Sequence, residues 1–481
     1  MKKRWVLPVM AAVFISLLTG CEKKDPYGLS EKDPVTITIW HYYNGVQKEE
    51  FDRLVQEFNE NEGREKGIIV KAFNKGSIDE LSLLINESIE KKIGSDPLPD
   101  VFSAYVDKVY EVDQMGLAAD LSSYLTSDEI GEYVDAYMEE GKFDSTGAIK
   151  VFPIAKSTEI LTVNKTDWDK FAEATGETEE ALSTWEGITR VAESYYKWTD
   201  SLTEEPDDGK AFFGRDAFAN YMIIGSLQLG HEVFKVKDGK TVLDFDEQTM
   251  RKLWDNYYVP YVNGYFGSYG KFRSDDVKTG QLVAFVGATS GIAYFPTSVT
   301  LEDGTNYAIE SKLYPLPNFQ GTVPCAVQQG AGMMVFKSEE KREYAATLFL
   351  KWFTCVGQNM KFAIGSGYLP VKKTAGNEEL LKPFLAEAGE DSGASQNLLI
   401  GLNTANQYRL YTSKPFKGGD RARNVLNLAM VLKAKEDYEK ICTLMEQGVK
   451  RESAVAEFVT EENFGQWYRD TMEQLEAIIG E

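Results

Sequence analysis

The sequence predicts an α/β fold in which mostly parallel sheets are covered by helices on both faces. Three observations lead to this prediction. First, β-branched residues alternate with threonine over residues 35–40, apolar residues recur at helical spacing from Phe51 to Phe58, and a second strand follows at 68–73. Second, this β-α-β order recurs further along the chain. Third, 481 residues with 43% hydrophobic and 26% charged side chains have the composition of a globular protein with a large core.

The remaining elements follow in the same alternating order. Apolar spacing predicts a helix over 78–89, a short strand over 100–103, a strand over 160–163, a helix from 184–186 onward and a helix over 217–229. Asp244 and Asp246 stand where a helix N-cap is expected before Met250. Amphipathic helices are predicted over 341–353 and 464–479. The sequence has no long linker inside this region, which favours lobes that exchange chain over independent domains.

The N-terminus has the features of a bacterial export signal. Lys2, Lys3 and Arg4 precede an apolar run over 5–18, which is too short to span a bilayer comfortably and has the length of a signal-peptide core. The run closes on Leu18-Thr19-Gly20-Cys21, which resembles the bacterial lipobox. That resemblance implies a cleaved signal peptide over 1–20, a diacylglycerol on Cys21, a polar tether over 21–34 and a lipid-anchored protein on the outer face of the cytoplasmic membrane.

Charge and composition exclude several classes of function. Lys+Arg 52 against Asp+Glu 75 gives a net charge of -23, which disfavours nucleic acid and anionic lipid headgroups as partners. The sequence has only two histidines, His41 and His231, so we expect neither a His-rich metal centre nor histidine-based catalysis. If Cys21 is lipidated, Cys325, Cys355 and Cys442 remain, so at least one thiol is unpaired, and we expect all three to be buried.

Several segments, taken in order, resemble the carbohydrate-type solute-binding proteins of ABC importers, which include maltose- and glycerol-phosphate-binding proteins. The segments are 37–41 (ITIWH), 98–102 (LPDVF), 152–161 (FPIAKSTEIL), 164–165 (NK), 184–186 (TWE), 280–290 (GQLVAFVGATS) and 367–371 (GYLPV). The resemblance implies the two-lobed periplasmic-binding-protein fold of type II, with hinge crossings between the lobes. We expect lobe 1 to comprise 35–154 plus 286–345 and lobe 2 to comprise 155–285 plus 346–481.

The same resemblance implies a function without chemistry or cofactor. The protein would be a monomer that captures an extracellular solute by lobe closure and delivers it to the membrane subunits of an ABC permease. A carbohydrate is the favoured cargo. An anionic solute such as a glycerol phosphodiester is the alternative. A surface glycosidase is less favoured because no catalytic motif accompanies the abundant carboxylates, and a membrane-tethered ligand sensor with the same fold is a further alternative.

A sugar site needs aromatic faces for the ring and polar groups for the hydroxyls. Residues that follow predicted strands are candidates, since ligands bind beyond the carboxyl ends of parallel strands. Others follow from the resemblance, which places ligand contacts on the first crossing, at the turn after 280–289 and in the late GYLPV segment. The candidate ligand-binding residues are Tyr42, Tyr43, Asn44, Asp107, Lys108, Ser157, Glu159, Tyr221, Ser290, Tyr368 and Arg421. For Tyr221 and Tyr368 the alternative interpretation is that the side chain packs in the hydrophobic core and does not contact ligand.

Arg421 belongs to the one basic concentration in this acidic chain. Arg423, Lys414 and Lys417 lie near it, and Gly418-Gly419 would let backbone approach a ligand closely. A phosphate or carboxylate could bind there, and contact with the permease or with solvent is the other interpretation.

Overall fold

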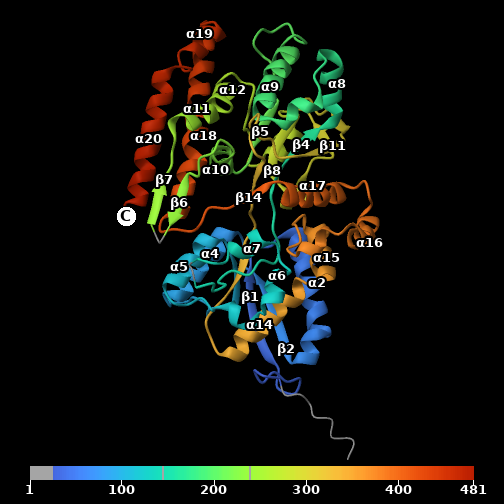
Figure 1. The fold of residues 1–481 in the computed structure, drawn as a ribbon. Coiled ribbons are helices and arrows are strands. Elements are labelled where there is room, and N and C mark those ends of the chain that lie inside the picture. Colours follow the sequence, from blue (N-terminus) through green and yellow to red (C-terminus); the bar gives the residue numbers. More distant parts are fainter. Residues whose placement is uncertain (1–24, 144–145, 238–239) are drawn as a thin grey trace, which may run out of the picture.

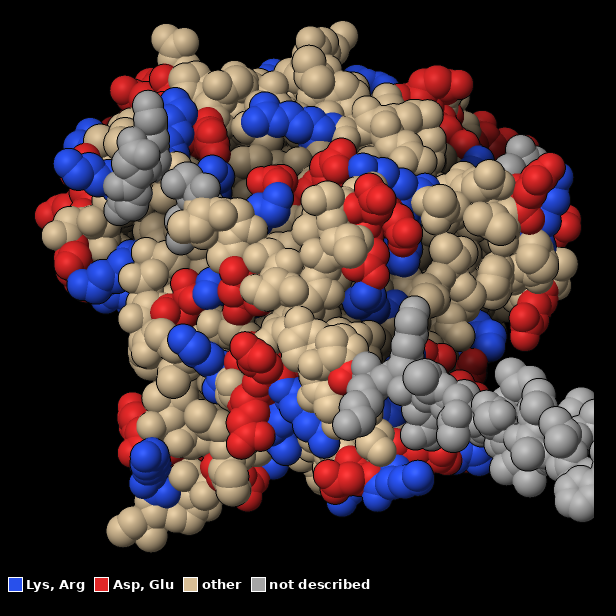
Figure 2. Space-filling model, turned by 60° about the horizontal axis from the view of Figure 1, so that its bottom comes forward, with Lys and Arg blue, Asp and Glu red and all other residues tan. Residues whose placement is uncertain are grey.

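The chain forms two lobes, one above the other in Figure 1, with extended segments passing between them. We describe them from a computed structural model, which covers residues 25–143, 146–237 and 240–481. The lipidation site expected at Cys21 and the expected signal peptide lie outside these residues. In the described part of the chain, no helix combines the length and the apolar composition that crossing a bilayer requires. Figure 2 shows acidic and basic side chains interspersed over one face of the molecule.

Lobe 1 is built on a four-stranded sheet in the order β13-β3-β1-β2. Its strands are β1 (Val35–His41), β2 (Ile68–Asn74), β3 (Val101–Ala104) and β13 (Gly332–Val335). β1 pairs in parallel with β2 and β3, and β13 adds an antiparallel edge. One face packs against α2 (Gly45–Glu60), α14 (Glu340–Phe353) and α15 (Val356–Ser366), and the other against α4 (Ile78–Ile89) and α5 (Val106–Gln114). The expected β-α-β start is confirmed.

Lobe 2 is built on a second sheet in the order β11-β4-β8-β5. Its strands are β4 (Glu159–Asn164), β5 (Phe213–Arg215), β8 (Ala284–Ala288) and β11 (Ser311–Pro315). Only the β5–β8 pair is parallel, whereas β4 runs antiparallel to both of its neighbours. A mostly parallel sheet was expected in each lobe, and in lobe 2 that expectation is wrong, because β4 enters this sheet from the crossing in the direction opposite to β8.

The helices of lobe 2 come from two distant parts of the chain. Its single large core joins α8 (Lys165–Thr175), α9 (Trp185–Asp200), α10 (Phe218–Gln228), α11 (Glu247–Asp255) and α12 (Tyr258–Val262) to the C-terminal helices α18 (Gly419–Glu446) and α20 (Glu461–Ile479). The helices expected at 217–229 and 464–479 are therefore present. Asp246 caps α11 by accepting from the Thr249 amide at 2.8 Å, as the sequence predicts.

The smaller elements connect these layers. They are α3 (Glu62–Lys66), η1 (Leu121–Tyr124), α6 (Ser127–Gly131), α7 (Asp135–Glu139), η2 (Glu179–Ser183), β6 (Phe234–Lys237), β7 (Lys240–Leu243), α13 (Arg273–Lys278), η3 (Thr289–Tyr294), β9 (Ser298–Thr300), β10 (Asn306–Ala308), β12 (Cys325–Val327), η4 (Lys373–Gly376), α16 (Glu378–Ala388), α17 (Gly393–Gln407), β14 (Arg409–Tyr411) and α19 (Arg451–Ala456).

Three stretches cross between the lobes. The first, 152–159, leads into β4, and the second, 325–333, runs from β12 to β13. The backbones of Ser157 and Gln329 bond each other in both directions, at 2.8 and 3.0 Å, so these two crossings lie side by side. β14 forms part of the third, which leads to α18, and it pairs in parallel with β12. Three paired crossings make a hinge about which two rigid lobes can turn.

The two sheets divide the chain at different points from those expected. Residues 286–315 were expected in lobe 1, but β8 and β11 pair with β4 in the sheet of lobe 2. Residues from 346 onward were expected in lobe 2, but the second half of α14 and α15 pack in lobe 1, where Phe349 and Phe362 are buried in the core. The chain thus reaches lobe 2 again at α17, which contacts β11.

Two smaller expectations also differ from the structure. The tether was expected to extend to residue 34, but Tyr27 contacts the ring of Tyr344 with centroids 4.2 Å apart, and Leu29 is buried in the core of lobe 1. Apolar side chains in this segment therefore fold it onto the lobe. Cys325, Cys355 and Cys442 are free thiols, but only Cys325 is buried, and Cys355 is exposed at the start of α15.

Candidate functional site

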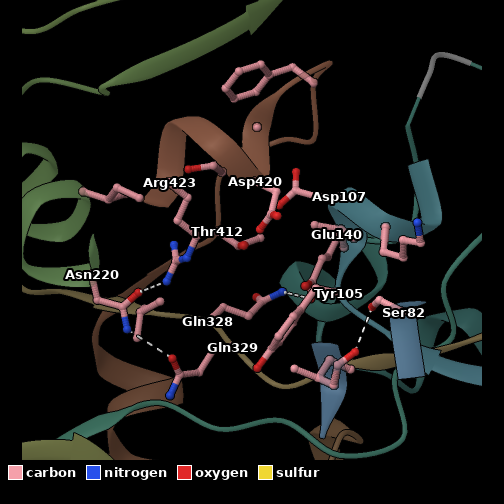
Figure 3. Close-up of a pocket in the computed structure, with 18 of the residues that line it drawn as sticks. Ser82, Tyr105, Asp107, Glu140, Asn220, Gln328, Gln329, Thr412, Asp420 and Arg423 are labelled. Carbon is pink, nitrogen blue, oxygen red and sulfur yellow. Dashed lines mark hydrogen bonds between the residues drawn. The ribbon is translucent and has the colours of Figure 1, made fainter. Parts of the chain in front are cut away.

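A cleft of about 600 Å³ lies between the two lobes (Figure 3), within the size range of small-molecule sites. α4, α5 and Glu140 form its wall on lobe 1. α10 and the first turn of α18 form the wall on lobe 2, and the crossings supply its floor. The polar and aromatic side chains that line it include Asp79, Ser82, Asn86, Tyr105, Asp107, Lys108, Glu111, Glu140, Asn220, Gln328, Gln329, Tyr411, Thr412, Ser413, Asp420 and Arg423.

The cleft is more acidic than basic. Five carboxylates line it, namely Asp79, Asp107, Glu111, Glu140 and Asp420, against the two cations Lys108 and Arg423. Lys108 is already engaged, since its Nζ contacts Glu111 at 2.9 Å and Asn86 Oδ1 at 2.6 Å. Carboxylates and amides accept hydrogen bonds from hydroxyl groups, and the rings of Tyr105 and Tyr411 offer apolar faces.

Asp107 marks the point where the two lobes approach each other. It lies in the first turn of α5 in lobe 1, and Gly419 opens α18 in lobe 2. A Cβ atom on Gly419 would lie 2.9 Å from Asp107 Oδ1, so the carboxylate faces bare backbone across the cleft. In Figure 3, Asp107 and Asp420 point toward each other.

This environment raises the pKa of the Asp107 carboxyl to about 7. Burial is the largest cause, and the nearby charges of Asp420, Glu111 and Glu140 add to it, while Arg423 opposes it. Near neutral pH, Asp107 therefore exchanges between a hydrogen-bond donor and a charged acceptor.

Replacing Asp107 with Asn is expected to weaken the pH dependence of stability between about pH 4 and pH 7. In that window the folded protein holds a proton on Asp107 that the unfolded chain has released, so wild-type stability falls as the pH rises. Urea unfolding of both proteins at pH 5 and pH 8 measures the difference. The D107N variant should gain stability relative to wild type at pH 8, and an equal difference at the two pH values would contradict the assignment.

A buried hydrogen-bonded chain lies behind the lobe 2 wall. Asn220 Nδ2 donates to Glu159 Oε1 at 2.9 Å and to Gln329 Oε1 at 3.1 Å, and Asn220 Oδ1 accepts from Arg423. Both Glu159 oxygens accept from Arg215 Nη2, at 3.0 and 2.9 Å. Glu159 and Asn220 are each 1% exposed, so this chain is fixed in the protein interior.

A second buried chain supports the floor. Lys156, 1% exposed on the first crossing, donates to the Glu140 carboxylate and to the Gly330 carbonyl at 3.0 Å. Glu140 also accepts from Gln328 Nε2 at 2.6 Å (Figure 3). A cation from one crossing and an amide from another thus hold one carboxylate of lobe 1 at the base of the cleft.

Of the residues proposed from sequence, only Asp107 and Lys108 line this cleft. Tyr42, Tyr43 and Tyr368 form an aromatic cluster inside lobe 1. The hydroxyls of Tyr42 and Tyr368 are 2.9 Å apart, and Tyr43 is 0% exposed. The neighbouring His41 is also buried, which lowers its pKa to about 4. Strand β1 does end here, but α15 and η3 cover its end. Gln47 of α2 donates to the Ser290 carbonyl at 3.0 Å and so holds η3 in place.

The other proposed residues have structural partners. Ser157 pairs with the second crossing, and Glu159 lies behind the wall as described. Tyr221 is buried, and its hydroxyl donates to the Leu253 carbonyl at 2.9 Å. Asn44 is exposed and donates to the Tyr42 carbonyl at 2.8 Å. Arg421 points to the C-terminus, where its Nη2 lies 2.5 Å from Glu481.

Several lining residues were not proposed from sequence. Tyr105 precedes α5, Asn220 lies in a helix that is buried along its whole length, and Gln328 and Gln329 stand on the second crossing. Gln328 and Gln329 interrupt an otherwise apolar run from Cys325 to Met334, and this break could have identified them from sequence as candidate site residues. No comparable sequence pattern marks Asn220. Arg423 was recognised only as a neighbour of Arg421.

The fold and the cleft define a two-lobed binding protein, in which a hinge joins lobes that both contribute side chains to one site. A family model described as bacterial extracellular solute-binding protein matches residues 53–386, more than half of the chain. The chain therefore belongs to the bacterial extracellular solute-binding proteins. A search of curated proteins finds no significant match.

Solved structures with the same fold cover nearly the whole chain. UgpB from Mycobacterium tuberculosis in complex with glycerophosphocholine is 18% identical with a TM-score of 0.65, over 93% of this chain and 98% of that one. A cyclic alpha-maltosyl-1,6-maltose binding protein from Arthrobacter globiformis is 17% identical with a TM-score of 0.63, over 93% and 99%. An ABC substrate-binding protein from Listeria monocytogenes in complex with cycloalternan is 16% identical with a TM-score of 0.61, over 92% and 100%. These similarities establish the fold.

Proposed function

We propose that this chain is the substrate-binding lipoprotein of an ABC importer, which captures an extracellular sugar or oligosaccharide by lobe closure and delivers it to a membrane permease. The observation that carries the proposal is the interlobe cleft, whose carboxylates, amides and tyrosine rings come from both lobes. Ligand contacts made by both lobes at once lower the free energy of the closed state relative to the open one, and so drive closure.

The chemistry of the cleft favours a neutral polyhydroxylated cargo. Glu111 is paired with Lys108 and Glu140 with Lys156, which leaves three carboxylates of the cleft against Arg423. These carboxylates would repel an anion, whereas they accept hydrogen bonds from hydroxyls. Sugar-binding proteins among the structural neighbours agree with this choice. We propose that the protein binds its cargo without hydrolysing it, because the family to which it belongs is one of solute-binding proteins.

An anionic or zwitterionic solute such as a glycerol phosphodiester is the second candidate. Arg423 favours it, because a guanidinium facing the cleft can bind a phosphate, and one structural neighbour holds glycerophosphocholine. Asp107 and Asp420 count against it, since both carboxylates lie close to the same guanidinium.

Attachment and delivery complete the proposal. The Leu18-to-Cys21 segment supports a diacylglycerol anchor that holds the protein as a monomer on the outer face of the bacterial cytoplasmic membrane. Tyr27 and Leu29, six and eight residues after Cys21, pack on lobe 1. The partners are then the cargo, the lipid bilayer and the ABC permease subunits.

Thermal unfolding with a panel of solutes tests the cargo. The panel contains maltotriose, a cyclic maltosyl-maltose, glycerophosphocholine and a short peptide. A sugar present at 100 times its dissociation constant is expected to raise the free energy of unfolding by about 2.7 kcal/mol. If the sugars leave the unfolding curve unmoved and glycerophosphocholine shifts it, the carbohydrate assignment fails and the second candidate replaces it.

A further inference from the structure

The guanidinium of Arg423 is held in the cleft by a single neutral side chain. Its Nη2 donates to Asn220 Oδ1, and within the described part of the chain this is the only hydrogen bond that the Arg423 side chain makes. None of them forms an ion pair with it within 4.0 Å, although Asp420 lies three residues earlier on α18 and Asp107 faces it from lobe 1. The carboxylates of Asp107 and Asp420 are thus close enough to attract the Arg423 guanidinium, but its hydrogen bond goes to the Asn220 amide.

The orientation of the Asn220 amide is fixed by its partners. Glu159 is engaged as an acceptor from Arg215 and Asn220, and Arg423 can only donate. The NH₂ group of Asn220 must therefore face Glu159 and Gln329, and its carbonyl oxygen must face Arg423. Asn220 is 1% exposed and cannot turn without leaving Glu159 with fewer donors in the interior.

The same amide joins α10 to two of the hinge crossings. Glu159 begins β4 at the end of the first crossing, and Gln329 lies on the second, where its backbone bonds Ser157. Ala217, at the start of α10, adopts φ +44°, which is rare for a residue with a side chain, so the segment that presents Asn220 is itself constrained. The position of Arg423 is thereby tied to the hinge.

We propose that Asn220 is a positioning residue, which holds the Arg423 guanidinium toward the cargo by anchoring it to Glu159 and Gln329 of the two crossings. Although Asn220 lines the cleft, its Nδ2 donates to Glu159 and Gln329 and its Oδ1 accepts from Arg423, so it acts through Arg423. Without Asn220, Arg423 turns to Asp420 or Asp107, and an ion pair takes up the guanidinium that would otherwise face the cargo. The effect on cargo binding rests on the function proposed above, whereas the effect on the Arg423 side chain does not.

The test compares N220L with N427L in the full chain. Asn427 provides a matched control, because its Oδ1 accepts from the Ala219 amide at 3.1 Å and so also ties α10 to α18, whereas the hydrogen bond that holds the Arg423 side chain comes from Asn220. Crystal structures of the unliganded variants are expected to place Arg423 within 4 Å of Asp420 or Asp107 in N220L, and in its wild-type position in N427L. An unmoved Arg423 in N220L overturns the proposal. If N220L does not fold, N220A takes its place.

Binding of maltotriose provides the second readout. N220L is expected to weaken binding about tenfold or more, R423A by at least as much, and the double variant N220L/R423A no further than R423A alone. Such non-additivity is the mark of one residue acting through another, whereas a general structural role predicts that the two losses add. Additive losses overturn the proposal. If neither maltotriose nor the cyclic maltosyl-maltose binds the wild type, the cargo assignment fails, and the position of Arg423 in the unliganded variants still decides this inference.

Discussion

Replacing Glu159 with glutamine is expected to destabilise the unliganded protein by about 3 kcal/mol, because it leaves the charge of Arg215 without a counter-ion in the protein interior. Both side chains are 1% exposed, and the guanidinium lies 5.6 Å from the ring centroid of Trp185 and 5.3 Å from that of Tyr221. Water cannot replace the lost carboxylate in such surroundings. Urea unfolding near pH 7 measures the change.

The double variant E159L/R215M is the control. Replacing both members of a buried ion pair by apolar side chains removes the uncompensated charge, so this variant should be more stable than E159Q. If E159Q unfolds at the same urea concentration as the wild type, Glu159 does not neutralise the charge of Arg215, and the buried ion pair does not stabilise the fold.

Replacing Gly419 with leucine is expected to weaken cargo binding by about tenfold to 100-fold with little change in the stability of the unliganded protein. A Cβ at this position already falls 2.9 Å from Asp107 Oδ1, so a larger side chain would keep the lobes apart. Overpacking of this kind costs about 1–3 kcal/mol while the lobes lie this close, and lobes without cargo can move apart to relieve it. Isothermal titration with the sugar that shifts the unfolding curve most measures the loss.

The matched control is G357L. Gly357 occupies the first turn of α15, as Gly419 occupies the first turn of α18, but a Cβ there meets no atom within 4 Å. This variant should bind as the wild type does. Unchanged affinity in G419L would mean that the lobes need not approach each other at Asp107 for cargo to bind.

Much of the fold could be predicted from sequence because local patterns carry it. The alternating residues of β1 and the helical spacing of α2 follow from side-chain burial on one face of each element. Lobe membership was predicted less well, since β8 and β11 pair with a strand more than a hundred residues earlier. Nothing within a strand specifies which of two sheets it will join.

The candidate site was predicted poorly for a related reason. Residues after the first strand were favoured because ligands often bind there, but η3 and α15 cover that position, and Tyr43 ends in the core. The cleft is lined largely by helix faces instead. Arg421 and Arg423 differ by about 200° around α18, so only Arg423 turns to the cleft while Arg421 meets the C-terminus.

The sequence by itself determined the α/β alternation, the acidic balance and the membership of a solute-binding family, because these depend on composition and on the local order of residues. Only the tertiary structure decided which polar side chains face the cleft and which form hydrogen bonds or ion pairs inside the protein. Glu159 meets Arg215, and Asn220 meets Arg423. Such pairs are set by three-dimensional proximity between residues up to 203 positions apart, for which the local sequence contains no signal.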